Sequence, residues 1–249
     1  MIVNRAWITG AGKGIGRALA KTLAAESWTV AVSARTVSDL QQLQDECNPE
    51  LIKIFPLDVT NQEETVNTIE QIELTIGMPN LVIFNAGAHA PISPGNFTSE
   101  TVRQLIEVNL MGVVNGLAEI IPRFVKIGGG HIAVVASLSG YVGLPTASAY
   151  GASKAALINM CESLQPELKR YNVRLTLINP GFVETPLTDK NDFAMPFLIS
   201  AEDAAKRIIE GLNKDKFEIT FPKRLAIPMK LLRLLPYKFL FALTKRMIR

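Results

Sequence analysis

Short apolar runs rich in β-branched residues alternate with amphipathic stretches along almost the whole chain. Most runs are continuously apolar rather than alternating, which is typical of strands buried on both faces. Strand–helix alternation of this length predicts an α/β protein built on a doubly wound parallel sheet with helices on both faces. About seven strands are predicted, at Ala6–Thr9, Thr29–Ala34, Ile52–Val59, Leu81–Asn85, His131–Ser137, Arg174–Asn179 and Phe217–Phe221.

The helical stretches between these runs carry their own start signals. Thr60 precedes Glu63 and Glu64, and Ser200 precedes Glu202 and Asp203, as in helix N-caps. No linker-like segment or internal repeat interrupts the pattern, so residues 1–222 are predicted to form one domain. The predicted helices are Ile15–Glu26, Val37–Glu46, Gln62–Thr75, Ser99–Lys126, Ala147–Arg170 and Ala201–Leu212.

The few cysteines and histidines argue against a disulfide-rich secreted protein and against a histidine-rich metalloprotein. The two cysteines, Cys47 and Cys161, form no disulfide framework and favour a reduced cytoplasmic setting. The two histidines, His89 and His131, do not suffice for a histidine-rich metal site, and no metal is expected. The first glycine motif begins at Thr9, which leaves no room for a signal peptide before the fold.

Charge is distributed unevenly. The net charge is +3, yet the segment from Ile219 to Arg249 holds eight basic residues and no acidic ones. The rest of the chain therefore has 18 basic and 23 acidic residues. Positive charge belongs to the C-terminal tail, and a uniformly basic surface for nucleic acid is not implied.

A glycine-rich turn follows the first predicted strand and opens the first helix. It reads Thr9-Gly10-Ala11-Gly12-Lys13-Gly14-Ile15-Gly16, with glycines spaced G-x-x-x-G-x-G. Such glycines let backbone N–H groups approach a pyrophosphate at a helix N-terminus. The alternative interpretation is a glycine turn that binds no ligand.

The end of the second predicted strand indicates which dinucleotide is preferred. An NAD site usually carries an acid here for the ribose 2′-hydroxyl, but the segment reads Ser33-Ala34-Arg35-Thr36. Arg35 suits a 2′-phosphate, and Lys13 in the glycine turn has the same preference. We therefore predict NADP(H) over NAD(H), with a solvated loop arginine as the alternative.

Tyr150 and Lys154 lie four residues apart, with Ser137 upstream. On a helix this spacing puts the phenol and the ammonium on one face, where the ammonium is expected to lower the tyrosine pKa. A tyrosine that exchanges protons near neutral pH needs a pKa lowered by about 3, which is roughly 4 kcal/mol. Alone, the spacing would also suit a surface helix.

Taken together and in order, these motifs resemble the short-chain dehydrogenase/reductase family, in its single-domain branch of about 250 residues with a Rossmann-type fold. The resemblance covers about residues 3–222. It rests on the glycine turn, Ser137, Tyr150 and Lys154, and on further motifs at Leu57-Asp58-Val59, Asn85-Ala86-Gly87, Asn109 and Pro180-Gly181 followed by Thr185.

The resemblance implies a role for each matching position. Tyr150 would be the general acid or base, Ser137 would bind the substrate oxygen, Lys154 would hold the nicotinamide ribose, and Asn109 would support a water for proton relay. Asp58 would bind adenine, and Thr185 the nicotinamide carboxamide. The implied cofactor-binding set is Thr9, Gly10, Gly12, Lys13, Gly14, Ile15, Gly16, Arg35, Asp58, Val59, Asn85, Ala86, Gly87, Tyr150, Lys154, Pro180, Gly181, Val183 and Thr185.

Residues 186–199 match the mobile substrate lid of this family. Their apolar residues, with those of the facing loop, favour a lipophilic substrate: Leu187, Phe193, Met195, Phe197 and Leu198, facing Tyr141, Val142 and Leu144. His89 is interpreted as a loop histidine rather than a substrate contact, His131 as structural, Cys161 as a core or interface residue, and Glu184 as a solvated acid.

The tail, residues 223–249, interleaves basic and apolar residues, and Pro236 should divide it into two short helices. Two interpretations remain open. Basic amphipathic helices bind anionic membranes peripherally, here at the inner face of a membrane. Alternatively, the tail packs on its own domain or across a dimer.

The sequence therefore predicts an NADP(H)-dependent oxidoreductase that transfers hydride between nicotinamide and a small carbonyl or alcohol substrate. A non-catalytic NADP-binding regulator or scaffold is the alternative. By resemblance, the long helices at 99–126 and 147–170 would pair into a homodimer, and a tetramer is also compatible. A reduced NADP pool would favour carbonyl reduction.

Overall fold

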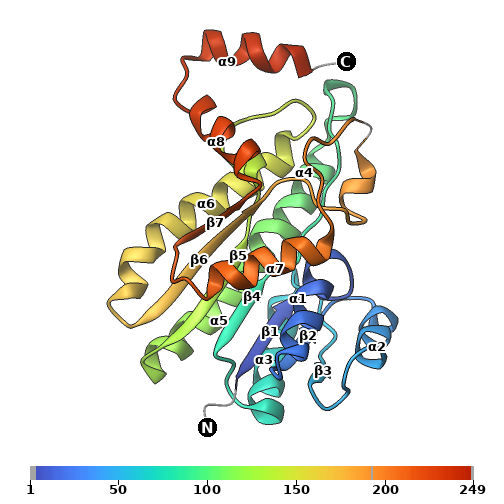
Figure 1. The fold of residues 1–249 in the computed structure, drawn as a ribbon, viewed down its shortest axis with the longest axis vertical. Coiled ribbons are helices and arrows are strands. Elements are labelled where there is room, and N and C mark those ends of the chain that lie inside the picture. Colours follow the sequence, from blue (N-terminus) through green and yellow to red (C-terminus); the bar gives the residue numbers. More distant parts are fainter. Residues whose placement is uncertain (1–3, 192, 248–249) are drawn as a thin grey trace.

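Seven parallel strands form one sheet in the order β3-β2-β1-β4-β5-β6-β7. The computed structural model describes residues 4–191 and 193–247. In Figure 1 the strands run through the middle of the molecule, with the first and last parts of the chain at opposite ends. The strands are β1 (Arg5–Thr9), β2 (Thr29–Ser33), β3 (Ile52–Ile54), β4 (Leu81–Phe84), β5 (Gly130–Val135), β6 (Val173–Pro180) and β7 (Glu218–Phe221).

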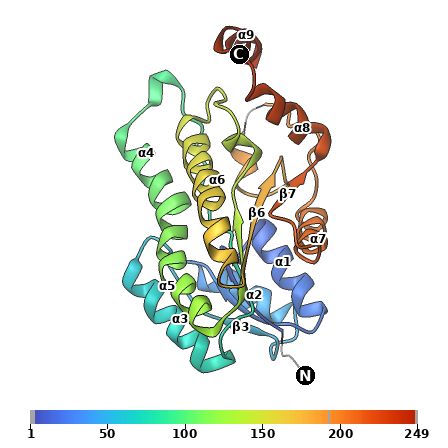
Figure 2. The same ribbon diagram turned by 90° about the vertical axis from the view of Figure 1, so that its left-hand side faces the viewer.

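Helices cover both faces of this sheet, as the doubly wound pattern predicted (Figure 2). One face carries α1 (Gly14–Ala25), α2 (Val37–Asp45) and α7 (Ala201–Leu212). The other face carries α3 (Gln62–Ile76), α5 (Gly112–Ile127) and α6 (Ser148–Lys169), and α4 (Ser99–Ile106) packs beside α6 through Leu105. The predicted fold class is confirmed.

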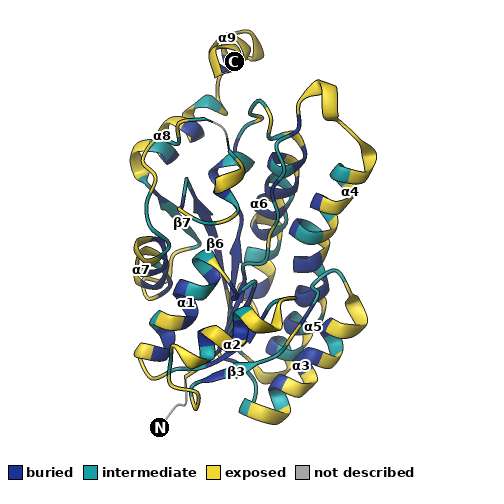
Figure 3. Ribbon diagram, turned by 90° about the vertical axis from the view of Figure 1, so that its right-hand side faces the viewer, coloured by how far each residue is buried: buried dark blue, intermediate teal, exposed yellow. Residues whose placement is uncertain are grey.

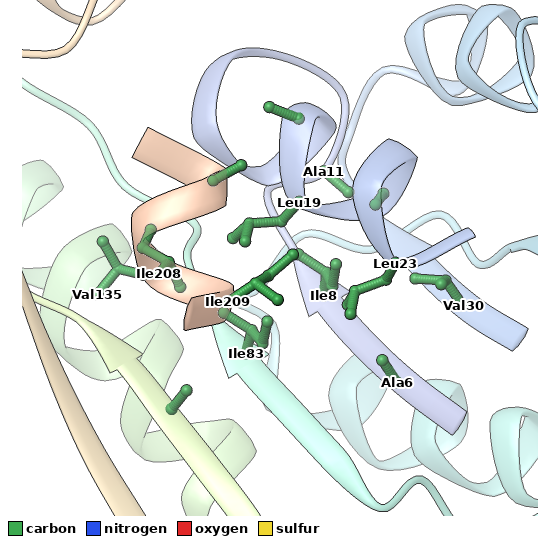
Figure 4. Close-up of a cluster of buried hydrophobic side chains, with 14 of the residues drawn as sticks. Ala6, Ile8, Ala11, Leu19, Leu23, Val30, Ile83, Val135, Ile208 and Ile209 are labelled. Carbon is green, nitrogen blue, oxygen red and sulfur yellow. The ribbon is translucent and has the colours of Figure 1, made fainter. Parts of the chain in front are cut away.

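Two apolar clusters hold these layers together, one on each face. In the first, Leu19 and Leu23 of α1 and Ile208 of α7 pack over Ile8 and Ile83 of the sheet (Figure 4). Burial follows the helix faces turned toward the sheet, while the outward faces stay exposed (Figure 3). Burying apolar area of this kind is the main favourable term in folding.

Several predicted boundaries differ from the structure by one or two residues, and the end of β3 differs by more. The strand predicted over Ile52–Val59 ends at Ile54, although the N–H groups of Phe55 and Leu57 still donate to the carbonyls of Val32 and Ala34 beside it. The helix cap predicted at Thr60 is wrong: the Asn61 side chain accepts the Glu64 N–H instead. Ser200 does cap α7, because its hydroxyl accepts the N–H of Asp203.

The long helix predicted over 99–126 is interrupted by one π-helical turn, Glu107–Met111, between α4 and α5. The combined helix Ser99–Ile127 is long and apolar enough to cross a membrane by length and composition alone. Its apolar face instead packs on the sheet, with Ile120 and Phe124 fully buried. A π turn inside a helix is often found at a functional site.

The strand order reverses between β1 and β4, so the loops after these two strands diverge to opposite faces. Ligands of open α/β sheets bind in the crevice that such a reversal opens at the carboxyl ends of the strands. The tail follows β7 at this same end, as α8 (Lys223–Leu232) and α9 (Tyr237–Thr244) (Figure 1). The two helices are separated just before α9 at Pro236, as predicted.

Candidate active site

A cleft of about 1770 Å³ opens at the carboxyl ends of the strands. Most of the residues singled out from the sequence line it, from the glycine turn to Tyr150, Lys154 and Thr185. Of the predicted catalytic and cofactor-binding residues, three do not line it: Thr9, Gly16 and Asn109. These three lie behind the lining and act on its shape.

Thr9 and Asn85 tie the ends of β1 and β4 together. The Thr9 hydroxyl accepts the N–H groups of Asn85 and Ala86 at 3.1 and 3.2 Å. The Asn85 amide donates to the carbonyls of Thr9 and Gly10, both at 3.1 Å. These bonds satisfy backbone groups where the strands diverge, and so they hold the crevice in shape.

The glycine turn has the geometry of an anion cradle. Gly10 and Gly14 have φ of +67° and +54°, which side-chain-bearing residues seldom adopt. A Cβ at Gly16 would lie 2.5 Å from the Asn85 amide nitrogen, so only glycine lets α1 approach this closely. No side chain caps the N-terminus of α1 at Lys13. The first N–H groups of α1 are therefore available to a phosphate.

Arg35 lines the same end of the cleft with Lys13, but an acid that the sequence reasoning missed lies beside them. The Asp39 carboxylate forms an ion pair with the Lys13 ammonium at 3.3 Å. The Arg17 guanidinium also donates to the backbone carbonyl of Asp39 at 3.0 Å, which fixes the first turn of α2. Asp39 lies in the first turn of α2, where an acidic side chain stabilises the helix dipole. Its position in the sequence therefore suggests a structural role and gives no sign of a contact with Lys13.

Lys154 is buried on α6, with only 3% of its surface exposed. Its ammonium donates to the carbonyl of Val135 at 2.9 Å. Burial lowers the pKa of Lys154 from 10.5 to about 8, because desolvation penalises the charged form. A Cβ at Gly87 would lie 3.7 Å from this ammonium, so glycine keeps the space beside it open.

Tyr150 lies one helical turn from Lys154, and the lysine ammonium is 5.8 Å from the centroid of its ring. Burial raises the pKa of the Tyr150 phenol, and the Ser137 hydroxyl partly opposes this. The expectation of a lowered tyrosine pKa is therefore wrong for the protein alone, because burial of the phenol raises its pKa more than the Ser137 hydroxyl lowers it. The raised pKa keeps the Tyr150 phenol protonated near neutral pH.

Asn109, in the π turn, connects two segments that line the cleft. Its carbonyl oxygen accepts the Ala88 N–H at 2.7 Å, and its amide donates to the Ala88 carbonyl at 2.9 Å and the Ser153 hydroxyl at 3.0 Å. The Ser153 hydroxyl in turn donates to the Tyr150 carbonyl at 2.7 Å. The amide is fully used, so its side chain joins the loop after β4 to the turn of α6 that bears the tyrosine.

His89 packs directly against Tyr150, which the interpretation as a loop histidine did not anticipate. The two rings meet edge to face, with centroids 4.8 Å apart. The His89 Nε2 is 3.1 Å from the Asn191 side-chain oxygen, and the Lys190 ammonium donates to the His89 carbonyl at 2.9 Å. Burial also lowers the His89 pKa. Through these contacts Lys190 and Asn191, in the segment after β6, bind the histidine that packs on Tyr150. No local sequence pattern predicts them, because the partners lie about a hundred residues apart.

The far end of the cleft is largely apolar. Leu187 and Phe193 of the predicted lid line it, together with Leu144 and with Ile92, Phe97 and Met229 from other parts of the chain. Tyr141 was expected here but faces away: its hydroxyl donates to the Glu218 carboxylate, and the Asn179 amide donates to that hydroxyl. The apolar lining therefore comes only in part from the expected residues. Four others that were expected there do not line the cleft: Val142, Met195, Phe197 and Leu198.

The remaining candidates lie outside the cleft lining. The His131 ring bonds the Thr176 hydroxyl at 2.9 Å, and burial lowers the pKa of His131 to about 4. Cys161 is fully buried in the second apolar cluster, and Glu184 is exposed. Within residues 4–191 and 193–247, no group of three or more His, Cys, Asp or Glu side chains is placed to hold a metal ion.

Comparison with known proteins agrees with this arrangement. A family model described as short chain dehydrogenase matches residues 4–195. A Myxococcus xanthus protein described as an uncharacterized oxidoreductase is 36% identical over 249 residues, covering 99% of this chain and 98% of the relative.

Solved structures share the fold at lower identity. A short chain dehydrogenase/reductase of Burkholderia phymatum in complex with NAD superposes with a TM-score of 0.86 at 22% identity, over 93% of both chains. A variant of actinorhodin polyketide ketoreductase with NADPH gives 0.82 at 22% identity, over 90% of this chain and 97% of that chain. With the family model spanning most of the sequence and the expected cleft at the sheet's switch point, this chain belongs to the short-chain dehydrogenase/reductase family of oxidoreductases.

Proposed function

We propose that this protein is an NADP(H)-dependent carbonyl reductase for lipophilic substrates, with Tyr150 as general acid. One observation carries the proposal: Ser137, Tyr150 and Lys154 converge on one cleft, in a setting that keeps the phenol protonated. A protonated phenol is the form that reduction of a carbonyl needs, because the developing alkoxide must receive a proton.

The residues present fit a nicotinamide dinucleotide. The uncapped N-terminus of α1 offers an anion site, and the close turn that leads into it needs glycines at 10, 14 and 16, because a Cβ there would collide with Ala86, Thr185 or Asn85. Asp58 and Val59 would hold the adenine end, and Thr185 the nicotinamide end. When bound, the cofactor supplies the hydride.

The chain's own groups handle the proton and the oxygen. Tyr150 donates its proton to the substrate oxygen as negative charge develops there, and the Ser137 hydroxyl stabilises that charge. The Ser137 oxygen is held in place by accepting the Ser139 N–H at 3.1 Å. The Lys154 ammonium then stabilises the phenolate that is left, and Asn109 keeps both helices in register with the loop after β4.

Lys13 and Arg35 support NADP(H), because two cations near the ribose favour a 2′-phosphate. Asp39 opposes them in part, since a phosphate would have to compete with its carboxylate for Lys13. Similar structures were solved with either NAD or NADPH, so the preference rests on these side chains. We further propose a cytoplasmic homodimer formed through α4, α5 and α6.

A screen of ketones and alcohols with NADPH and NADH, followed by nicotinamide absorbance, tests the proposal. Wild-type protein should oxidise NADPH with lipophilic ketones. Tyr150→Phe should lower kcat by about 10²-fold or more while leaving NADPH affinity within about threefold. Tyr171→Phe is the matched control, because Tyr171 is exposed just beyond α6.

Two outcomes would contradict the proposal. Turnover retained by Tyr150→Phe would remove the tyrosine from the chemistry. NADPH binding without turnover of any ketone or alcohol by the wild type would instead favour a non-catalytic NADP-binding regulator. Faster turnover of polar polyols than of every lipophilic ketone would refute the substrate class alone.

A further inference from the structure

The tail ends in a helix that stands clear of the sheet and its covering helices. In Figures 1 and 3, α9 lies beyond α8 at the end of the molecule, and its ribbon is almost entirely exposed. Of its eight residues only Leu240 and Thr244 are buried. Tyr237, Phe239 and Phe241 have 74%, 58% and 62% of their surfaces exposed. Large apolar side chains left in water in this number mark an interaction surface.

The same surface continues onto α8 and the turn that follows it. Ile227 and Leu231 on α8, and Leu234 after it, are each more than half exposed. The inner side of α8 is different, because Ala226 and Met229 are buried and the Lys230 ammonium pairs with Glu218. Packing on the protein itself therefore accounts for one side of α8 and for Leu240 and Thr244 of α9, and it leaves the other described residues of α9 exposed.

Positive charge is interleaved with these apolar groups. Lys223, Arg224, Arg233, Lys238, Lys245 and Arg246 are all exposed. Among the described residues none of these six takes part in an ion pair, whereas Lys230 does. No acidic residue follows Glu218 in the sequence. The surface therefore combines apolar anchors with uncompensated cations.

We propose that α9 and the outer side of α8 dock onto the surface of an anionic phospholipid bilayer. Interleaved basic and apolar side chains fit such a surface, since apolar groups enter the acyl boundary while Lys and Arg meet the headgroups. Tyr237 stacks on Phe241, with centroids 5.6 Å apart, and amphipathic aromatic rings favour this interfacial depth.

A second copy of this chain fits the surface less well. A two-fold interface would bring the same patch against itself, so the six exposed cations of one copy would face those of the other. Anionic headgroups supply the opposite charge that the chain itself lacks in this region. Charge complementarity therefore selects the bilayer.

The position of the tail links this docking to the proposed reductase function, on which the following step rests. Leu225 and Met229 of α8, and Arg246 and Met247 after α9, line the cleft that contains Tyr150. The docking surface thus borders the mouth of the cleft. A lipophilic carbonyl compound dissolved in the bilayer would enter from the membrane side.

Co-sedimentation of the full-length protein with vesicles tests the docking. Vesicles of phosphatidylcholine with 30% phosphatidylglycerol should bind at least about tenfold more protein than pure phosphatidylcholine, and 0.5 M salt should reduce the excess. The double variant Phe239→Glu with Phe241→Glu should lose this binding by at least about tenfold. Leu74→Glu is the matched control, because Leu74 is an exposed apolar residue on α3.

Several results would overturn the docking proposal: no binding by the wild type, equal binding to both vesicle types, or unchanged binding by the double variant. If the wild type binds no vesicles and the double variant elutes as a monomer where the wild type elutes as a dimer on gel filtration, the surface is an interface with a second copy of the chain. An unchanged melting temperature for the double variant separates lost docking from lost folding.

Activity assays distinguish failure of the docking proposal from failure of the proposed reductase function. With a water-soluble ketone the double variant should match the wild type, since neither phenylalanine lines the cleft. With a ketone embedded in anionic vesicles it should be several-fold slower. Vesicle binding without any reductase activity would leave the docking standing and refute the reductase. Equal rates with the embedded ketone would refute delivery from the membrane.

Discussion

Replacing Lys154 by methionine should stabilise the protein near neutral pH while abolishing its activity, and the gain should disappear in alkali. Lys154 is buried, and its pKa falls from 10.5 to about 8 on folding. Because the folded pKa is the lower one, the unfolded chain binds more protons between these pH values. Stability therefore rises with pH through that window.

The size of the effect follows from the two pKa values. Keeping the ammonium charged inside the fold costs about 3 kcal/mol at pH 7 and less than about 1 kcal/mol at pH 10. The free-energy difference between Lys154→Met and wild type should thus change by about 2 to 3 kcal/mol between these pH values. Lost packing, or the lost bond to the Val135 carbonyl, adds a constant that does not depend on pH.

Urea unfolding of both proteins at pH 7 and pH 10, without cofactor, measures this difference. Lys169→Met, an exposed change near the end of the same helix, should show the same difference from wild type at both pH values. A Lys154→Met difference that stays constant within about 0.5 kcal/mol between pH 7 and pH 10 would show that the ammonium is not desolvated as the structure implies.

Three further outcomes are expected. Asp39→Asn should tighten NADPH binding about fivefold, because it relieves roughly 1 kcal/mol of repulsion between the carboxylate and the 2′-phosphate. NADH binding should stay unchanged in the same fluorescence titrations. Asp45→Asn on the same helix is the control, and equal tightening for both cofactors would contradict the reasoning. Ser137→Ala should lower kcat about 10²- to 10³-fold with NADPH affinity kept, and a change confined to KM would count against its role. Ser200→Ala should lose about 1 kcal/mol of stability by removing the α7 cap, seen as a fall of about 2 to 4 °C in melting temperature; no fall would mean the cap contributes nothing.

Local pattern was enough to predict the sheet, both helical layers and many of the residues that line the cleft. Continuous apolar runs reveal buried parallel strands, and Gly10 and Gly14 are needed for positive φ angles, which are a local backbone geometry. Tyr150 and Lys154 were paired by helical spacing alone. In each case the signal depends on a few neighbouring residues, so the sequence carries it directly.

Only the tertiary structure decided what surrounds those residues. It places Asp39 on Lys13, packs His89 against Tyr150 and turns Tyr141 away to Glu218, all through contacts between distant segments. It also reverses the expected shift of the tyrosine pKa, because desolvation depends on packing from every side. The sequence determined which groups the site contains and where the tail carries its charge. Packing determined which groups meet, which lose their water, and that α9 stays uncovered beside the cleft.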